Sequence, residues 1–536
     1  MSIKTILSAA MGMTVAATTA AMSSSPESDP IADFQNGWAG KALAMQRQLD
    51  LNEPMSQSSI LGSHNTYNSE EYRTALRYID PQQKHSIYDQ LRLGARFLEL
   101  DAHWTYKIDG FDWGNDILLC HSGIGQNFGD VHVGCSLADR RLSDGLEEVR
   151  RWLDENPAEV IILYIEDHVD GEHTRLWNTL NSKLGNKFYA SGGCKSVPSD
   201  LSKADVLMSG KQVVLWKDKG CSSDSTMAGV AFSGLGDISR IWEDRTGIGA
   251  IGAFFNGTAV SRLEAADIER EFKAGRNLVN LDDITHDDGR LEAAVWSWDR
   301  NEPNNQGGDQ DCAVQWENGR WDDDNCGNQY HFACESQDDG SWSLSTTTGA
   351  WTEGTAACAA LAGNYTFSVP TSAGDNEALK AAKGGNTHVW LNYNDRLYEG
   401  NWQVPQGQGL FRELRDARSN LCLDVEWGNA TNGTNVRLWT CNGDNAQKWV
   451  YDSANGYLRS ALGKCLDNRG HQHDGGEIVI WDCVDSNNLR FDWVGQTIRN
   501  RHNHNFALDA FGTESGAQVG QWSHHGGANQ RWYWGN

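Results

Sequence analysis

Short apolar runs alternate with amphipathic stretches over the first half of the chain. Four of the runs end on polar residues and cover positions 60–65, 95–101, 117–121 and 160–166. Three later runs cover positions 212–216, 251–255 and 277–281, and amphipathic segments lie between runs at 142–155 and 259–274. Buried parallel strands read as such near-continuous apolar stretches. The alternation therefore predicts a parallel α/β fold, a (β/α)8 TIM-like barrel over residues 33–290.

The ends of the first four runs carry side chains that can act together, because catalytic residues of parallel barrels lie at the carboxyl ends of several strands. Two histidines fall at such ends, His64 and His121. Histidine is the side chain best suited to acid–base work near neutral pH. His103 and His168 also fall near strand ends, so the residue type alone does not select the pair.

The same strand ends carry oxygen ligands, namely Asn65, Glu99, Asp101 and Glu166. Because Glu99 and Asp101 are two residues apart, both side chains leave the same face of a strand. Three carboxylates with an amide oxygen suit Ca²⁺ better than zinc. A salt-bridge network with cations such as Arg96 is the alternative interpretation.

The sequence changes character after residue 290. Residues 291–403 are rich in Trp, Gly and Asn, and a Gly/Gln/Pro stretch at 404–409 predicts a linker. Residues 411–536 then repeat one motif three times, at 422–424, 465–467 and 507–509, each followed by a Trp and by a Gln-x-Trp-like element. Repeated units that are too small to bury their own apolar face predict a pseudo-threefold all-β domain.

Twelve cysteines, an even number, fit an oxidising compartment. They fall into six local pairs: Cys120/Cys135, Cys194/Cys221, Cys312/Cys326, Cys334/Cys358, Cys422/Cys441 and Cys465/Cys483. The third repeat has Ala507 and His524 in place of both cysteines. Loss of both together predicts that the last two pairs are disulfides within their repeats.

Charge and the first residues bear on location and partners. The formal net charge of −27 argues against nucleic-acid binding through a basic groove. Lys4, an apolar Ala-rich stretch over residues 6–21 and a Ser-rich sequence after it predict a signal peptide over residues 1–22. We therefore expect secretion, to the extracellular space or a periplasm.

Four motifs surround the strand-end residues: Ser63-His64-Asn65-Thr66-Tyr67, Gly94-Ala95-Arg96-Phe97-Leu98-Glu99-Leu100-Asp101, His121-Ser122-Gly123 and Asn156-Pro157-Ala158-Glu159-Val160-Ile161-Ile162. They resemble the catalytic X region of phosphatidylinositol-specific phospholipase C over roughly residues 55–220. Many bacterial members have an arginine where Asp101 stands and use no calcium. The Glu-x-Asp pair is that of the calcium-dependent branch, so the resemblance implies Ca²⁺ held by Asn65, Glu99, Asp101 and Glu166.

The same resemblance implies a mechanism. His64 would be the general base on the inositol 2-hydroxyl, and His121 would protonate the departing diacylglycerol oxygen. Lys217 and Lys219 resemble phosphate-binding lysines of the family. Glycerophosphodiester phosphodiesterases are the alternative enzyme family, although their usual His-Arg start is absent because Asn65 follows His64.

Residues 291–403 carry two sets of motifs in reversed order. Glu302-Pro303-Asn304, Gly319-Arg320-Trp321-Asp322-Asp323 and Phe332-Ala333-Cys334-Glu335 resemble the second half of a C-type lectin domain, and Trp390-Leu391-Asn392-Tyr393-Asn394-Asp395 resembles its first half. We interpret this order as a circular permutation, with two separate half-domains as the alternative. The resemblance implies the pairs Cys312–Cys326 and Cys334–Cys358, and calcium or sugar ligands at Glu302, Asn304, Asp322 and Asp323.

The threefold repeat resembles the ricin-type β-trefoil lectin, whose sugar site combines the Asp of the repeat, the aromatic residue and an Asn before the Gln. The third repeat has all four: Asp509, Trp522, Asn529 and Gln530. The second has Asp467, Trp481 and Asn488 but has Leu489 in place of the Gln, and in the first repeat Ala446 replaces the Asn. We expect the third repeat to be the best carbohydrate site.

These predictions combine into an exported, calcium-dependent phosphodiesterase that cleaves inositol phospholipids. Its contact with membranes would be peripheral, and its two lectin-like modules would raise its concentration at glycan-coated surfaces. A glycan-binding protein with an inactive barrel is the competing interpretation.

Overall fold

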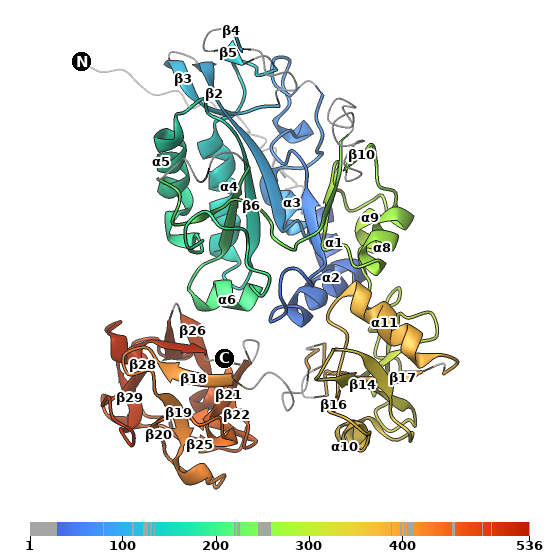
Figure 1. Ribbon diagram of the computed structural model, residues 1–536, viewed down its shortest axis with the longest axis vertical. Helices are drawn as coiled ribbons and strands as arrows, with labels where there is room; N and C mark the ends of the chain where they lie inside the picture. Colours follow the sequence, from blue (N-terminus) through green and yellow to red (C-terminus); the bar gives the residue numbers. More distant parts are fainter. Residues whose placement is uncertain are drawn as a thin grey trace, which may run out of the picture.

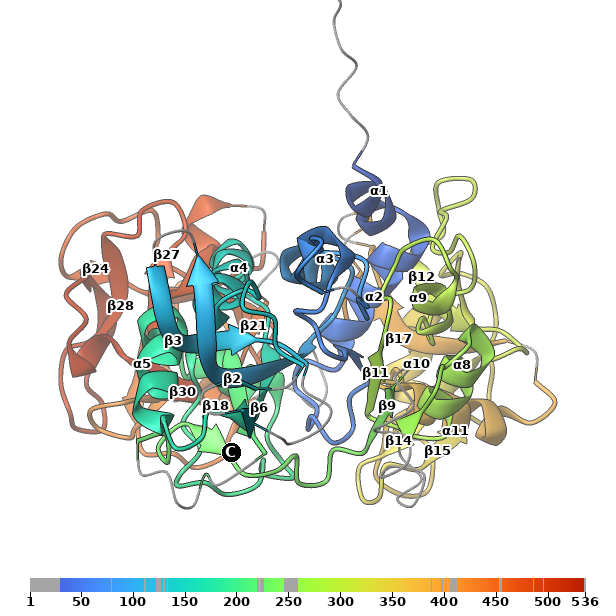
Figure 2. The same ribbon diagram turned by 90° about the horizontal axis from the view of Figure 1, so that it is seen from above.

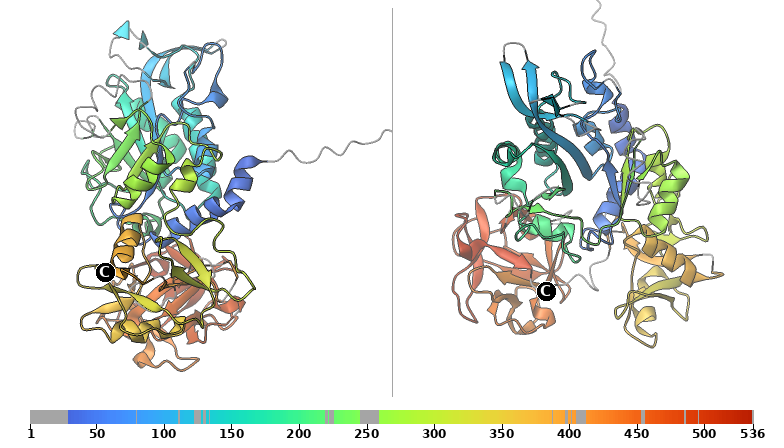
Figure 3. Two further views of the ribbon diagram at one scale, coloured as in Figure 1. Left: turned by 90° about the vertical axis from the view of Figure 1, so that its right-hand side faces the viewer. Right: turned by 45° about the horizontal axis from the view of Figure 1, so that its top comes forward.

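The computed structural model describes residues 29–534, except 79, 110–111, 122–126, 129–130, 133, 219–220, 222–225, 245–258, 387, 397–398, 401, 405–411, 453–455, 485 and 495. The predicted signal peptide, the predicted strand at 251–255 and most of the predicted linker lie outside these residues. Three bodies are visible in Figure 1: an N-terminal α/β body, a middle module (residues 291–403) and a C-terminal all-β body. Both later bodies lie at the same end of the first one (Figures 1 and 3).

Eight parallel strands form the centre of the N-terminal body. They are β1 (Ile60–Ser63), β2 (Phe97–Asp109), β6 (Ile161–His168), β7 (Val213–Lys217), β8 (Ala231–Phe232), β9 (Arg240–Glu243), β10 (Ala259–Val260) and β11 (Leu278–Leu281). Their order is β10-β9-β11-β1-β2-β6-β7-β8. The described strands form a parallel half-barrel, in which no pairing between β8 and β10 is seen among the described residues.

The run at 117–121 does not form a parallel strand, which corrects the sequence prediction. It belongs to β3 (Asp112–Leu119), which pairs antiparallel with β2 from Ala102↔Leu119 to Asp109↔Asp112. An apolar run has the same pattern in either orientation, so periodicity alone does not distinguish the two. The β2–β3 hairpin extends beyond the parallel sheet, away from the other two bodies (Figure 3).

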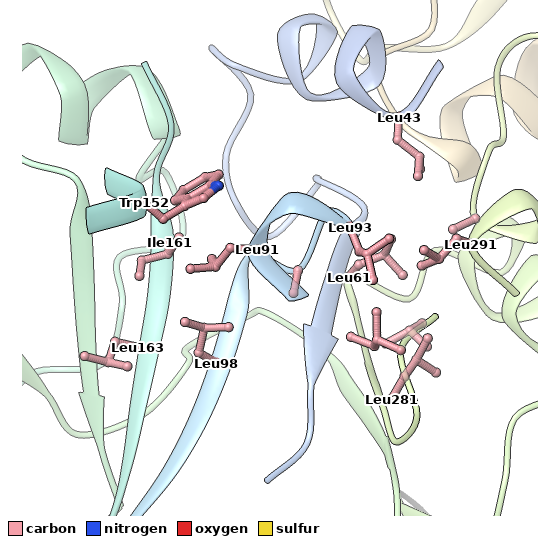
Figure 4. Packing of buried hydrophobic residues seen from close by; sticks show 14 of the residues in the cluster. Leu43, Leu61, Leu91, Leu93, Leu98, Trp152, Ile161, Leu163, Leu281 and Leu291 are labelled. Atoms are coloured by element: carbon pink, nitrogen blue, oxygen red, sulfur yellow. The ribbon is translucent and has the colours of Figure 1, made fainter. Parts of the chain in front are cut away.

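Helices cover the outside of the half-barrel. They are α1 (Pro30–Asn36), α2 (Trp38–Leu49), α3 (Ile87–Arg92), α4 (Leu142–Glu155), α5 (His173–Leu184), α6 (Lys203–Met208), α8 (Ala265–Lys273) and α9 (Arg290–Ala293). The predicted helical segment at 259–274 is therefore a short strand followed by a helix. Leu98 and Leu163, on neighbouring strands, pack with Leu91 of α3 and Trp152 of α4 (Figure 4).

The middle module is built on one sheet that draws strands from both ends of its sequence. The strands are β12 (Cys312–Gln315), β13 (Trp321–Asp324), β14 (His331–Ser336), β15 (Trp342–Leu344), β16 (Tyr365–Phe367) and β17 (Val389–Asn394), and the helices are α10 (Gly354–Ala359) and α11 (Ala373–Lys383). The late strand β17 lies between β12 and β14. The two sequence halves therefore share a sheet and are not separate half-domains.

Helix α2 joins the N-terminal body to the middle module (Figure 2). The buried Gln46 side chain accepts hydrogen bonds from the backbone N–H of Trp296 (2.8 Å) and from the N–H (3.2 Å) and hydroxyl (3.0 Å) of Ser297. Its amide donates to the carbonyl of Ala294 at 3.3 Å. A single apolar core runs from the half-barrel into the module and includes Trp298.

The C-terminal body repeats one unit three times around its own core. Its strands are β18 (Arg412–Asp416), β19 (Cys422–Val425), β20 (Val436–Trp439), β21 (Lys448–Asp452), β22 (Tyr457–Ser460), β23 (Lys464–Asp467), β24 (Gly476–Glu477), β25 (Val479–Trp481), β26 (Phe491–Val494), β27 (Thr497–Asn500), β28 (Phe506–Ala510), β29 (Val519–Ser523) and β30 (Trp532–Trp534). The first and last strands, β18 and β30, pair with each other. This pairing closes the threefold structure.

Six disulfides join the six predicted pairs: Cys120–Cys135, Cys194–Cys221, Cys312–Cys326, Cys334–Cys358, Cys422–Cys441 and Cys465–Cys483. They fit an oxidising compartment. Among the described helices, none combines the length and apolar character that crossing a bilayer requires.

Candidate active site and carbohydrate sites

Three acids from two neighbouring strands meet at the carboxyl ends of the parallel sheet. Glu99 and Asp101 leave the same face of β2, and Asp101 lies opposite Glu166 of β6 in the strand register. One carboxylate oxygen from each of the three lies within 4.8 Å of the others. The predicted convergence of these acids is therefore present.

The two acids on β2 are held differently. Glu99 is paired with Arg240 at 2.6 Å and accepts a hydrogen bond from the amide of Asn280 at 2.9 Å. Asp101 accepts a hydrogen bond from the Tyr67 hydroxyl at 2.9 Å. Burial and the charges of Glu166 and Glu99 raise the pKa of Asp101 well above its usual range.

The amide of Asn65 completes a set of hard oxygen donors. Its oxygen accepts a hydrogen bond from the Tyr67 hydroxyl at 3.3 Å, and its nitrogen donates to the side-chain oxygen of Gln82 at 2.7 Å. Together with the three crowded acids, this donor set fits Ca²⁺, which takes carboxylate and amide oxygens.

His64 lies beside this cluster and is oriented by an acid from the other neighbouring strand. Its Nδ1 is 2.9 Å from Oδ1 of Asp282, which follows β11 and is buried. A carboxylate only accepts, so Nδ1 carries the proton and Nε2 is left as the basic nitrogen. Burial lowers the His64 pKa, but the charge of Glu99 and the hydrogen bond and charge of Asp282 outweigh it, and the net shift is upward.

His121 directly follows the β3 arm of the hairpin. Burial and the positive charge of His64 lower the His121 pKa, against the opposite effects of Glu166 and Asp244. The charge of His64 therefore acts on His121, although the two residues come from a parallel and an antiparallel strand.

In the middle module, the predicted ligands Glu302, Asp322 and Asp323 bring carboxylate oxygens within 4.8 Å of one another. Burial and the charges of Asp322 and Asp323 raise the pKa of Glu302 to about 8. Asp323 accepts hydrogen bonds from the backbone N–H of Asn304 (2.9 Å) and Asn305 (2.7 Å), so its carboxylate also shapes this loop. The Asn304 amide donates to Glu302 at 2.8 Å.

In the third repeat of the C-terminal body, the four predicted residues converge. Asp509 accepts hydrogen bonds from Asn529 (2.8 and 2.9 Å) and Gln530 (2.9 Å), and Trp522 is 40% exposed beside it. In the second repeat, Asp467 accepts from Asn488 at 2.6 Å and Trp481 is 38% exposed.

In the first repeat, an arginine side chain lies where a sugar would bind. Arg437 donates to Asp424 at 3.0 Å, and its guanidinium lies 4.2 Å from the ring centroid of Trp439. The arginine therefore binds the carboxylate and covers the aromatic face that a sugar would need.

Three family models match the chain. The Rv2075c PI-PLC-like domain matches residues 29–236, the Lectin C-type domain matches residues 277–336, and the Ricin-type beta-trefoil lectin domain matches residues 410–533. The chain joins a PI-PLC-like domain to two lectin-type modules.

Curated proteins and solved structures are similar to parts of this chain. Two uncharacterized proteins of Mycobacterium tuberculosis, MT2135 and Rv2075c, are each 26% identical over 401 residues, which cover 67% of this chain and 80% of theirs. The PI-PLC X domain-containing protein At5g67130 of Arabidopsis thaliana is 37% identical over 87 residues, 16% of this chain and 17% of that protein. Among solved structures, the designed 3-fold symmetric protein ThreeFoil is 28% identical, with a TM-score of 0.22, over 24% of this chain and 99% of that chain.

The structure gives less support to the predicted phosphate-binding lysines than to the acids of the site. Lys217 is 1% exposed and pairs with Asp167 at 2.5 Å, so its charge is already engaged. Lys219 lies outside the described residues. A role for either lysine in phosphate binding stays a prediction.

Two residues of this site have roles that the sequence did not predict. Asp282 orients His64. Its position directly after the apolar run at 277–281 is the sequence feature that places it at a strand end. Arg240 pairs with Glu99 and lies 4.7 Å from the ring centroid of Trp242 and 5.0 Å from that of Phe97. Its strand, β9, has the sequence Arg-Ile-Trp-Glu and alternates half-buried with buried residues, so it lacks the continuous apolar run of the predicted strands.

Proposed function

We propose that the chain is a calcium-dependent phosphoric diester hydrolase that cleaves phosphatidylinositol-type lipids into diacylglycerol and a cyclic inositol phosphate. The observation that carries this proposal is the placement of His64. Its Nδ1 is held by Asp282, its basic Nε2 lies 3.3 Å from the amide nitrogen of Asn65, and the cluster of Glu99, Asp101 and Glu166 lies on β2 and β6. Acid–base groups beside an oxygen-rich cation site suit phosphoryl transfer.

Asn65, Glu99, Asp101 and Glu166 would hold the calcium ion. Bound there, the ion would lower the pKa of the attacking hydroxyl and offset charge on the phosphate. Arg240 neutralises part of the charge on Glu99, which reduces the repulsion among the acids before the ion binds.

The chain's own residues would move the protons. Nε2 of His64 removes the proton from the inositol 2-hydroxyl, and the oxygen attacks phosphorus to form the cyclic phosphate. His121 donates a proton to the glycerol oxygen as the P–O bond to diacylglycerol breaks. The low pKa of free His121 rises when an anionic diester binds nearby, because a negative charge favours imidazolium.

An apolar patch supports contact with a lipid surface. In the described part of the PI-PLC-like domain, the exposed large apolar side chains are Leu76, Ile108, Trp113 and Leu137, which we call the hairpin patch. Ile108 lies opposite Trp113 in the hairpin, and its N–H donates to the carbonyl of Leu137 at 2.9 Å. The Ser136 hydroxyl donates to the carbonyl of Leu76, which brings the fourth member alongside.

The hairpin patch lies on the strand that carries two of the acids. β2 runs from Glu99 and Asp101 to Ile108, so the patch is on the side of the sheet where the site opens. Trp and aliphatic side chains are suited to the interface of a bilayer. We propose that this patch rests on the membrane that contains the substrate.

Further features of the proposal concern the fold and location. We propose that the half-barrel belongs to a closed TIM-like barrel and that the middle module has a permuted C-type lectin fold. The β-trefoil and the middle module would bind glycans and concentrate the enzyme at cell surfaces. Residues 1–22 would direct export, for which six disulfides are suited.

The direct test is the release of cyclic inositol phosphate from phosphatidylinositol vesicles. We expect release with calcium, little with a chelator, and a loss of at least about 10²-fold in His64→Ala and in His121→Ala. Activity that resists the chelator, or that is unchanged in His64→Ala, would contradict the mechanism. Choline or glycerol headgroup lipids tested in parallel define the substrate.

A further inference from the structure

A cavity of about 550 Å³ lies between the PI-PLC-like domain and the middle module. One wall is helix α2, through Trp38, Lys41 and Gln48. The opposite wall is the loop that carries the predicted sugar ligands, through Glu302, Asn304 and Asn305. Its volume is within the range of about 300–1,000 Å³ that is usual for small-molecule sites.

The two walls are fixed relative to each other. Gln46 lies on α2 between the cavity residues Met45 and Gln48, and its side chain makes four hydrogen bonds to the start of the middle module. Arg320 of the module also pairs with Glu269 of α8 at 2.9 Å. A ligand would therefore meet a pocket that is already formed, which reduces the entropic cost of binding.

The lining has the chemistry of a carbohydrate site. The indole of Trp38 offers an aromatic face for the apolar side of a sugar ring, and the exposed Gln48 offers an amide that donates to and accepts from hydroxyls. The Asn304 amide donates to Glu302 and that of Asn305 to Glu399, so these residues hold the second wall in shape. Glu302 offers a carboxyl group that can hydrogen-bond to a hydroxyl. Lys41 is exposed, and no ion pair engages it among the described residues.

We propose that an oligosaccharide binds in this cavity and that α2 of the PI-PLC-like domain forms half of the site. This inference rests on the proposed carbohydrate binding by the loop at Glu302. It adds that the site is composite, because the module alone would lack one wall. Binding of the glycan would also strengthen the attachment of the module to the PI-PLC-like domain, since the ligand contacts both.

The test uses the full chain on a glycan array. Glycans that wild type binds and Glu302→Ala does not bind identify the ligands of this site, while those lost in Asp509→Ala belong to the β-trefoil. The affinity for the first group is then measured in Gln48→Arg, which places bulk in the cavity from an exposed position, and in Trp38→Ala. Gln35→Ala, exposed at the end of α1 and outside the cavity, is the matched control.

We expect Gln48→Arg and Trp38→Ala to bind the Glu302-dependent glycans about tenfold or more weakly, which corresponds to about 1.4 kcal/mol. Gln35→Ala should bind them as wild type does, and all variants should keep the Asp509-dependent glycans. Because Trp38 is half-buried, thermal melting verifies that its variant is folded, and Gln48→Arg tests the inference independently.

Two results would overturn the inference, and they are distinguishable. If Glu302-dependent glycans exist but Gln48→Arg binds them as wild type does, the composite site is wrong while carbohydrate binding by the loop stands. If no glycan depends on Glu302, both the composite site and the proposed carbohydrate function of the middle module are wrong.

Discussion

Asp282 and His64 are 218 residues apart in the sequence, yet Oδ1 of the first lies 2.9 Å from Nδ1 of the second. They stand at the ends of β11 and β1, which pair in parallel from Ile60↔Leu278 to Ser63↔Leu281. The strand register therefore brings an acid to the nitrogen that must keep its proton if the other nitrogen is to act as a base.

Replacement of this acid tests the orientation of the imidazole. We expect Asp282→Asn to lower kcat/KM by about 10² or more, because the amide can also donate to Nδ1 and so stabilise the wrong tautomer. Binding of calcium, measured separately, should change little. Asp237→Asn, an exposed acid on the same domain, is the control, and equal activity in both variants would contradict the assigned role.

The crowding of three acids predicts opposite effects of one substitution on the free and the calcium-loaded protein. Asp101→Asn removes a carboxyl whose pKa is raised by burial and by its acidic neighbours. We expect a higher melting temperature than wild type in chelator, because repulsion is relieved, and a calcium affinity at least about tenfold lower. Terbium luminescence and thermal melting with and without calcium measure both effects.

Changes in the hairpin patch should impair binding to lipid vesicles but not the hydrolysis of soluble substrates. Trp113→Ala combined with Leu76→Ser should weaken binding to phosphatidylinositol vesicles, measured by sedimentation, by about 10²-fold or more, since each side chain contributes on the order of 1.5–3 kcal/mol when buried. Hydrolysis of a short-chain soluble substrate should be unchanged. Trp427→Ala, which removes a Trp that is 78% exposed on the β-trefoil, is the matched control.

The three β-trefoil repeats predict unequal responses to the same substitution. Asp509→Ala should remove binding to its glycans, because Asn529 and Gln530 orient this acid and Trp522 of the paired strand is 40% exposed. Asp424→Ala should have little effect, because Arg437 already engages that acid and covers Trp439. Isothermal titration with a glycan identified on the array compares the two, and equal losses would contradict a blocked first repeat.

A buried acid near the middle module predicts a dependence of stability on pH. Burial and the charges of Glu335 and Asp375 raise the pKa of Glu53 to about 7. Between the ordinary pKa of 4.5 and about 7, the folded state binds more protons than the unfolded state. The free energy of unfolding therefore falls as the pH rises through that window. Glu53→Gln should melt higher than wild type at pH 8 and similarly at pH 4, whereas Glu70→Gln, an exposed acid, should not.

Local pattern was sufficient for much of the fold and part of the site. The buried runs of β1, β2, β6, β7 and β11 are continuous in the sequence, so their positions followed from hydrophobicity alone. The spacing of Glu99 and Asp101 likewise fixed their shared face. The disulfides of the β-trefoil followed from the joint loss of two cysteines in its third copy.

Features that depend on pairing between residues far apart in the sequence could not be predicted from local pattern. The orientation of β3 depends on its hydrogen bonds to β2, and both orientations bury the same apolar side chains. The contact of Asp282 with His64 depends on which strands are neighbours. Arg437 fills the first sugar position because of its side-chain direction, which a comparison of motif residues does not include.

The β2–β3 hairpin connects two residues of the site to the membrane-facing patch through one pair of strands. Asp101 lies at its base on one arm, His121 follows the other arm, and Trp113 lies at its outer end, about 23 Å away at the usual rise of a strand. Cross-strand hydrogen bonds run along this length, so a tilt imposed at the outer end moves both basal residues together. The depth to which the protein settles in a lipid layer would thereby bear on the positions of both Asp101 and His121.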